Sequence, residues 1–226
     1  AVPPFWRFTN QLQLTYPISP KTKIAVSARY NLEELKNNYA IYNAGTVTYT
    51  KGKEVNKDFN INPVITHIIN KNLKTSLRLY ANRFETSQKL NQSTTASSFY
   101  DDYLNEGFYS IENQTDYTLN NKFSFNAGAG YVAQPVRSSR YDDINSVKKN
   151  NHGHFFAQGE YRASERFMLI TGFRYDKYSL YQSSFSPKLS MLFKANRKIS
   201  FTASVGKGFK TPAFRQLYLN FTNNAA

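Results

Sequence analysis

Hydrophobic and polar residues alternate along most of the chain. From Trp6 to Tyr16 every second residue is mostly apolar, and the residues between them, from Arg7 to Thr15, are all polar. A period of two places successive side chains on opposite faces of an extended strand. The same alternation recurs clearly at 24–31, 76–82, 123–131, 155–162, 185–194 and 199–205, and more weakly at 58–69, 105–118 and 167–178. These segments predict an all-β protein of about ten strands and give no convincing helix.

The connections between the expected strands alternate in length. Short turns are expected near 17–22, 70–72, 119–121, 164–166 and 195–197, and longer links near 36–57, 87–104, 135–151 and 179–184. An antiparallel up-and-down meander has this layout, with all short turns at one end. Bacterial outer-membrane barrels combine it with strands of about ten residues that alternate in polarity. We therefore predict a segment of a transmembrane β-barrel.

Composition supports that prediction and excludes other classes. The chain has 226 residues, a mean hydropathy of −0.58 and an aromatic content of 16%. The absence of Cys excludes a disulfide scaffold, a Cys-ligated zinc site and a thiol nucleophile. No run approaches 18 apolar residues, so no transmembrane helix is expected. Many aromatic residues in a hydrophilic chain fit strands that face lipid on one side and water on the other.

The net charge of +14 is unevenly placed. Windows around the expected short turns, 17–24, 70–74, 119–122, 162–166 and 194–198, hold ten of the 29 cationic residues and only one acidic residue, Glu165. The ten are Lys21, Lys23, Lys71, Lys74, Lys122, Arg162, Arg166, Lys194, Arg197 and Lys198. Such a ring suits anionic lipid headgroups, although Lys is also common in solvated turns. Other cations, such as Arg29, Arg78 and Arg174, share the polar face of their strands. No single basic stripe results, so a nucleic-acid partner is not expected.

Catalytic motifs are missing from the sequence. We find no nucleophile elbow, phosphate-binding loop or dinucleotide fingerprint, and we expect no enzymatic activity. The acidic pairs Asp101–Asp102 and Asp142–Asp143 lie in expected long loops, where solvated charge explains them. Their spacing is not that of an EF-hand calcium loop. The protein itself is expected to carry no cofactor or resident metal.

Two groups of residues are candidates for ligand binding. His152 and His154 lie two apart and so face the same way, toward the expected lumen near the loop end. Paired imidazoles there could ligate haem iron, or they could simply form a polar strand end. Tyr100 and Tyr103 lie in a loop segment that mixes aromatic and acidic residues. Such loops favour binding, but this one could equally cap the barrel mouth.

Two features are difficult to reconcile with the predicted strands. Pro63 falls inside the expected strand 58–69, where it removes a ladder donor, so either a bulge or a different register is required. Glu112 and Asp116 share one face of strand 105–118, which is acceptable only if that face is wet.

Two separated motifs resemble one family. The run Gly206–Tyr218, GKGFKTPAFRQLY, resembles the mid-barrel motif of TonB-dependent outer-membrane receptors. Upstream, Phe173–Asp176 (FRYD) and Phe185–Leu189 (FSPKL) also resemble that family, in the expected order. Phe209 and Lys210 begin an element similar to the Phe/Tyr-Arg-Ala-Pro box of the haem-receptor branch. Lys210 and Thr211 depart from that box, and its companion Asn-Pro-x-Leu box is missing.

The resemblance implies a 22-stranded barrel with an N-terminal plug. Residues 1–226 would then form part of one barrel domain, and we expect the plug and the remaining strands to lie outside this chain. The implied function is energy-coupled import of a scarce ligand: an iron–siderophore complex, haem or cobalamin. The implied partners are outer-membrane lipid, an inner-membrane TonB-type energy coupler, the small-molecule ligand and, in some cases, a surface lipoprotein. His152, His154, Tyr100, Tyr103, Phe209 and Lys210 are the candidate ligand-binding residues.

Two other functions stay open on sequence grounds. One is a passive outer-membrane porin without a plug, and the other is a soluble secreted β-protein that acts as an adhesin or binding module. The membrane interpretation fails if the apolar faces pack against a second protein layer. The residues that decide this are Leu12, Leu14, Phe123, Phe125, Phe201 and Val205.

Overall fold

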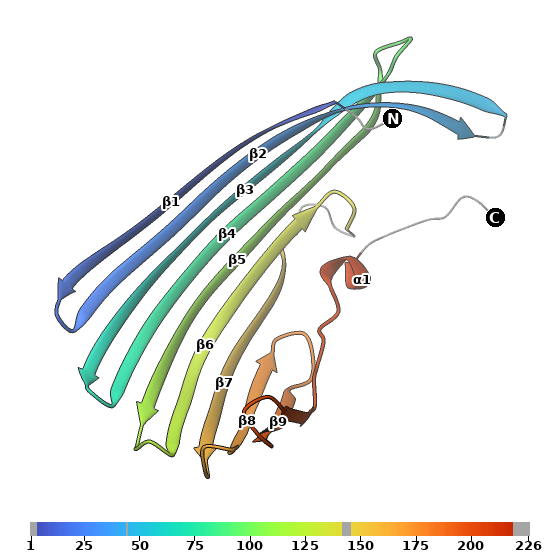
Figure 1. Cartoon of the computed structure of the whole chain (residues 1–226). Coiled ribbons are helices and arrows are strands. Elements are labelled where there is room, and N and C mark those ends of the chain that lie inside the picture. Colours follow the sequence, from blue (N-terminus) through green and yellow to red (C-terminus); the bar gives the residue numbers. More distant parts are fainter. Residues whose placement is uncertain (1–3, 44, 142–145, 219–226) are drawn as a thin grey trace.

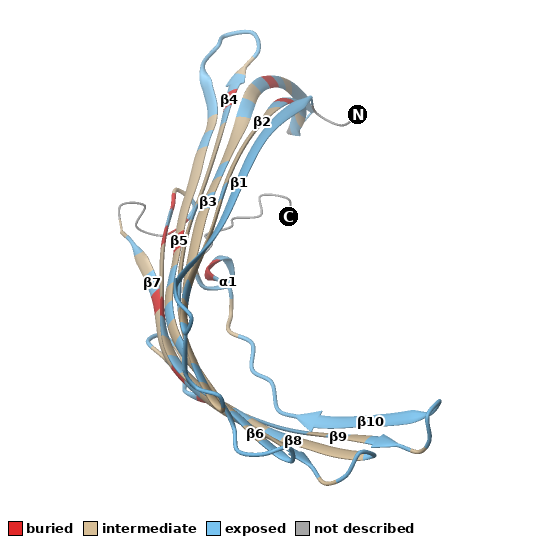
Figure 2. Ribbon diagram, turned by 60° about the vertical axis from the view of Figure 1, so that its left-hand side comes forward, coloured by how far each residue is buried: buried red, intermediate tan, exposed pale blue. Residues whose placement is uncertain are grey.

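Ten antiparallel strands form a single sheet in the computed structural model, which describes residues 4–43, 45–141 and 146–218. The strands are β1 (Phe5–Ser19), β2 (Thr22–Asn43), β3 (Thr46–Asn70), β4 (Leu73–Gln92), β5 (Ser98–Thr118), β6 (Phe123–Ser138), β7 (Lys148–Arg162), β8 (Phe167–Tyr178), β9 (Ser184–Lys194) and β10 (Ser200–Gly206). Each strand pairs with its neighbours in sequence, and β1 and β10 are the two edges. The sheet curves into an open trough (Figures 1 and 2). The prediction of an incomplete up-and-down barrel is confirmed.

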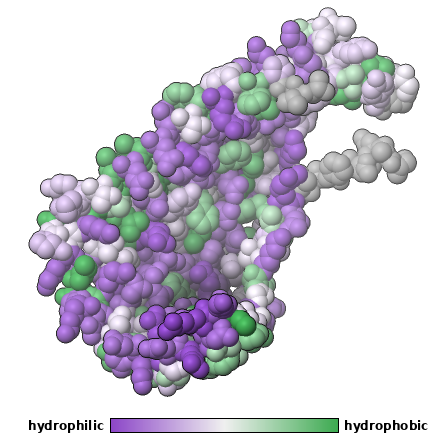
Figure 3. All heavy atoms as spheres, viewed as in Figure 1, coloured by the Kyte–Doolittle hydropathy of each residue, from purple (hydrophilic) through white to green (hydrophobic). Residues whose placement is uncertain are grey.

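The apolar face of the sheet is bare. Leu12, Leu14, Phe125, Phe201 and Val205 are 45–69% exposed, and no second layer covers them within the described ranges. A soluble sandwich would bury this face, whereas lipid solvates it. The opposite, concave face is mostly hydrophilic in Figure 3, which shows the molecule from the side seen in Figure 1. This arrangement of the two faces matches a membrane barrel wall.

Two of the expected long loops are strands instead. The segment 36–57 belongs to β2 and β3, which remain paired as far as Asn43 and Thr46. Most of 87–104 likewise extends β4 and β5. Both segments mix a few exposed aromatic side chains, such as Tyr42 and Tyr49, with many polar residues, so the alternation typical of a strand is broken over most of their length. Cross-strand ion pairs support them, with Lys53 Nζ 3.4 Å from Glu34 and Lys89 Nζ 3.1 Å from Asp101. Because β3 has 25 residues and a bilayer needs about ten, the hairpins project into water.

A short helix contradicts the expectation of none. α1 (Phe214–Tyr218) lies on the concave side of the sheet (Figure 2). Phe214 is buried against Val136 and Tyr141, which anchors the helix to the sheet. The side chain of Gln216 accepts a hydrogen bond from the backbone N–H of Ala213 at 2.8 Å, as in half of a capping box. A five-residue helix is too short to show a periodic pattern, which is why the sequence did not reveal it.

Pro63 is accommodated without a bulge. β3 and β4 keep one register on both sides of it, because Ile61 pairs with Ala81 and Val64 pairs with Arg78. No pairing to β4 is recorded for Asn62 or Pro63, so the ladder is interrupted locally rather than shifted. The strand therefore tolerates the missing N–H by losing pairs at one point.

The wet face needed by Glu112 and Asp116 is present. Glu112 lies 2.9 Å from Nε2 of His154 and 3.8 Å from Arg78. Asp116 lies 3.0 Å from Nζ of Lys74, and Asn126 also hydrogen-bonds to it. These polar networks run across the concave face. Among the described residues, no helix is long and apolar enough to cross a membrane.

Candidate functional site

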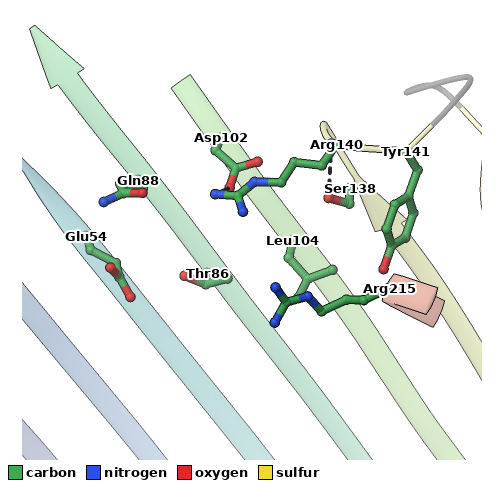
Figure 4. A pocket seen from close by; sticks show the side chains of 9 residues that line it. All are labelled: Glu54, Thr86, Gln88, Asp102, Leu104, Ser138, Arg140, Tyr141 and Arg215. Atoms are coloured by element: carbon green, nitrogen blue, oxygen red, sulfur yellow. Dashed lines mark hydrogen bonds and ion pairs between the residues drawn. The ribbon is translucent and has the colours of Figure 1, made fainter. Parts of the chain in front are cut away.

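Two polar clusters occupy the concave face toward the end opposite the short turns. The first, the mouth pocket, has a volume of about 220 Å³. Strands β3 to β6, the segment after β6 and α1 contribute its walls (Figure 4). Its lining consists of Glu54, Thr86, Gln88, Asp102, Leu104, Ser138, Arg140, Tyr141 and Arg215. The second, the histidine cluster, consists of His152, His154 and Asp176.

An ion-pair network organises one side of the mouth pocket. Arg140 and Asp102 point toward each other (Figure 4), and a guanidinium nitrogen lies 2.6 Å from the carboxylate. Ser139 Oγ also donates to Asp102, and Arg140 donates to the hydroxyl of Tyr100. The backbone N–H of Arg140 donates to Ser138 Oγ at 3.2 Å, which holds the turn after β6. Asp102 is thereby neutralised and held in one orientation.

The phenols near the pocket stay protonated at neutral pH. Burial, followed by the negative charge of Asp102, raises the pKa of Tyr100. Burial, followed by the charge of Glu106, raises the pKa of Tyr141. Protonated phenols act as both donors and acceptors of hydrogen bonds. They therefore suit recognition of a polar ligand better than acid–base chemistry.

The other side of the pocket brings a second guanidinium group. α1 projects Arg215 into the pocket, with Tyr141 beside it (Figure 4). Among the described residues Arg215 makes no ion pair, in contrast to Arg140. Since Arg140 is already paired, Arg215 supplies the positive charge of the pocket that is not part of an ion pair. Glu54 lies across the pocket from Arg215. The arrangement can hold an anionic or multiply hydrogen-bonding group.

Register brings the histidine cluster together. His154 on β7 pairs directly with Asp176 on β8. One potential ligand atom from each of His152, His154 and Asp176 lies within 4.8 Å of the others. Arg174 donates to both oxygens of Asp176, at 2.9 to 3.1 Å. The lack of a side chain at Gly130 makes room for the His154 ring, because a Cβ there would lie 2.7 Å from Cε1.

The structure brings some predicted residues together and separates others. His152 lies beside His154, and Tyr178 links it to Phe209, with ring centroids 4.8 and 5.7 Å from Tyr178. Tyr100 belongs to the Arg140–Asp102 network. Tyr103 is on the opposite face of β5 from Tyr100, because the two lie an odd number of residues apart in one strand.

The remaining predicted positions lie outside both clusters. Lys210 is exposed in the segment between β10 and α1. The pair Asp142–Asp143 lies outside the described residues, and Asp101 pairs with Lys89 on a solvated hairpin.

Sequence reasoning missed several residues that complete the clusters. Asp176, Arg140 and Arg215 come from different strands or from α1, and their proximity depends on register. Parity alone assigned Arg174 to the wet face, and applying the same parity to Asp176 would have placed it on the same face as His154, although parity does not place the two side by side.

A family model described as "TonB dependent receptor-like, beta-barrel" matches residues 4–226. No curated protein matches the sequence significantly.

Solved structures share the fold at low identity. A variant of the ferric enterobactin receptor PfeA from Pseudomonas aeruginosa is 13% identical with a TM-score of 0.70, over 94% of this chain and 34% of that one. The siderophore receptor PirA from Acinetobacter baumannii is 11% identical with a TM-score of 0.69, over 92% and 34%. The RagAB peptide importer is 11% identical with a TM-score of 0.65, over 89% and 32%. The chain thus spans about a third of each of these structures.

Proposed function

Because this chain belongs to the TonB-dependent receptor β-barrel family, we propose that it forms part of the wall of an energy-coupled importer for a small ligand. It resides in the outer membrane of a Gram-negative bacterium. The observation that carries the proposal is the pairing of a bare apolar outer face with a polar inner face that holds the mouth pocket. A wall of this kind lets cargo bind inside while lipid surrounds the outside.

The pocket chemistry favours an anionic, oxygen-rich cargo. Arg215 offers a guanidinium group without an ion-pair partner among the described residues, and Tyr141 offers a protonated hydroxyl group. Ferric complexes of catecholate or carboxylate chelators present several anionic oxygens, which match these donors. We therefore propose a ferric–siderophore complex as the cargo ahead of haem or cobalamin. The assignment to the haem branch from Phe209 and Lys210 stays a prediction.

The proposal includes parts that lie outside this chain. A sheet with free edges at β1 and β10 needs further strands to close in lipid. We propose that these strands, a plug domain and a contact site for a TonB-type energy coupler belong to the whole receptor. Cargo would bind from outside and pass inward when the plug moves, with no bond made or broken.

A surface lipoprotein partner is also proposed rather than shown. The β2–β3 hairpin projects from the end of the sheet opposite the short turns (Figure 1). Near its tip Tyr42 and Tyr49 are 78% and 62% exposed, and such aromatic side chains are common at protein interfaces. Removing the tip should abolish copurification of a lipoprotein without changing barrel assembly.

Uptake by whole cells tests the importer. The whole receptor would be expressed in a strain without its own siderophore receptors, and uptake of radioactive ferric enterobactin and of haem would be measured in parallel. We expect ferric enterobactin uptake that stops when the proton-motive force is collapsed. Arg215→Ala should weaken binding about 10-fold or more, because a hydrogen bond to a charged group is worth about 1.5–3 kcal/mol.

Two results would overturn this assignment. Uptake that persists without the proton-motive force would identify a passive porin. An equal loss of binding in Arg197→Ala, a matched change in a short turn far from the pocket, would show that Arg215 has no special role.

A further inference from the structure

We propose that His152, His154 and Asp176 bind one divalent transition-metal ion of the zinc type in the inner wall of the sheet. The three residues come from the paired strands β7 and β8. One candidate ligand atom from each lies within 4.8 Å of the others. This site is distinct from the mouth pocket, and it does not rest on the proposed cargo or on energy coupling.

The first observation is a pair of orphaned nitrogen atoms. The Nδ1 atoms of His152 and His154 are both buried and have no hydrogen-bond partner in the part of the chain that the structure describes. His154 as a whole is only 8% exposed. A buried polar atom without a partner costs about 1–3 kcal/mol, so such atoms are rare unless a ligand completes them. A metal ion between the rings would satisfy both.

Glu112 fixes the tautomer that metal binding requires. Its carboxylate lies 2.9 Å from Nε2 of His154. A carboxylate accepts hydrogen bonds, so Nε2 carries the proton and Nδ1 presents a free lone pair. Metal-bound histidines commonly donate their other N–H to a carboxylate in this way, which orients the ring and makes it a better ligand. Glu112 is therefore a positioning residue from a third strand, β5.

Asp176 keeps a lone pair for the ion despite its contact with Arg174. Three hydrogen bonds from Arg174 reach the carboxylate, which has about four acceptor sites. The guanidinium holds the carboxylate at the His154 side of the strand pair, as ligating carboxylates are usually held. Its side chain is 8% exposed, so water competes little for the remaining site.

The dimensions fit after a small adjustment. Ligand atoms around tetrahedral zinc lie about 3.3 Å apart, given bonds of about 2.0–2.1 Å. Moving each side chain inward by about 1 Å would close the observed span, and such a shift is a rotamer adjustment rather than a change of fold. Three protein ligands leave at least one coordination position open, as in exchangeable zinc sites.

The chemistry selects a bare transition-metal ion over the alternatives. Two imidazole nitrogens suit zinc, copper or nickel, whereas calcium and magnesium prefer all-oxygen ligands. Haem would need an open approach to an imidazole nitrogen, and the side chain of His154 is only 4% exposed. A small ion enters where a macrocycle does not.

Titration of the intact receptor in detergent with ZnCl₂, and with CoCl₂ for its absorption spectrum, tests the site. We expect one equivalent to bind, with nitrogen and oxygen ligands in the zinc X-ray absorption spectrum. His152→Ala, His154→Ala and Asp176→Asn should each weaken binding 100-fold or more. Glu112→Gln should weaken it by about 10–100-fold, as outer ligand partners do.

The third histidine provides the matched control. His67 lies in β3 near a short turn and contacts Thr22 Oγ through Nδ1 at 2.8 Å, so His67→Ala should leave zinc binding unchanged. Heat-modifiable gel mobility would confirm that each variant is folded. His152→Ala, which alters the less buried ring, keeps the test valid if His154→Ala misfolds. The proposal is overturned if folded receptor binds no zinc at millimolar concentration, or if both histidine variants bind it as tightly as the native protein.

Discussion

The two faces of each strand impose opposite demands on neighbouring residues. Leu79 on β4 points outward and is 39% exposed, whereas Arg78 beside it lies 3.8 Å from Glu112 on the inner face. A cation on the inner face finds water and counter-charges, but a cation on the outer face meets hydrocarbon. This difference makes the assignment of faces testable one residue at a time.

Leu79→Arg should destabilise the receptor strongly in lipid. An arginine facing the middle of the bilayer costs about 2–4 kcal/mol. Ser110→Arg, on the inner face of the adjacent strand β5, is the matched control and should cost less than about 1 kcal/mol. Denaturant unfolding of the whole receptor in lipid vesicles measures both. Equal losses would show that the outer face does not contact lipid.

A substitution at Gly130 tests whether the His154 ring occupies the space next to this glycine. A Cβ at this position would lie 2.6 Å from the carbonyl oxygen of Ile111 and 2.7 Å from Cε1 of His154. Overpacking of this kind costs about 1–3 kcal/mol, so Gly130→Ala should lower the free energy of unfolding by that amount. Gly153→Ala is the control, because its nearest contact would be 3.9 Å away. An equally large loss in the control would contradict the predicted clash.

Parity reveals residue orientation, but it does not reveal residue partners. The alternation in sequence correctly placed His152 and His154 on the wet face with Arg174. It could not pair His154 with Asp176 or Glu112, because those contacts follow from the registers of β5 to β8. The hydrophobic pattern of whole strands and the geometry of the turns together set these registers, and no short sequence motif records them.

At the scale of elements, the strands that cross lipid were predictable and those beyond it were not. β6 and β10 alternate clearly because lipid demands an apolar face. The outer parts of β2 to β5 meet water on both sides, so only their backbone ladder and ion pairs such as Lys53–Glu34 define them. α1 was not predicted for a different reason, because a helix of about one turn shows no hydrophobic periodicity in the sequence.

Phe214 is the buried side chain of α1, and Tyr218 packs against the same cluster on the sheet. Phe214 is 9% exposed and packs against Val136 and Tyr141, whereas Leu217 is 41% exposed. Truncating a buried Phe costs on the order of 3 kcal/mol, so Phe214→Ala should release α1 from the sheet. Amide hydrogen exchange of residues 214–218 in the whole receptor should then accelerate at least 10-fold. Leu217→Ala should change it little, and unchanged exchange in Phe214→Ala would contradict the anchoring.

Positive charge is concentrated at one end of the whole molecule. The ten turn cations lie at the end of the sheet where β1 meets β2 and β3 meets β4, opposite the projecting hairpins (Figure 1). Replacing Lys21, Lys71, Lys122 and Arg197 with Gln should reduce the extra stability that anionic lipid confers, although six of the ten cations remain. Each cation near an anionic surface contributes about 1 kcal/mol. Unfolding in vesicles with and without phosphatidylglycerol measures this, and an equal lipid effect in both proteins would identify ordinary solvated turns.

The open sheet predicts that this chain cannot form a closed barrel by itself. Edge strands β1 and β10 present unpaired N–H and C=O groups, and each such group costs several kcal/mol in hydrocarbon. The family motif in Gly206–Tyr218 pointed to a larger barrel, but the number and order of the missing strands are not encoded in these residues. Residues 1–226 alone should therefore fail to insert into vesicles as a protease-resistant, heat-modifiable species, whereas the whole receptor should do so.

Hydrogen exchange of β1 and β10 gives the sharper readout. Slow exchange at both edges in the whole receptor, and fast exchange in the isolated chain, would show that further strands pair there. A stable, closed barrel built from residues 1–226 alone would contradict the proposed larger receptor.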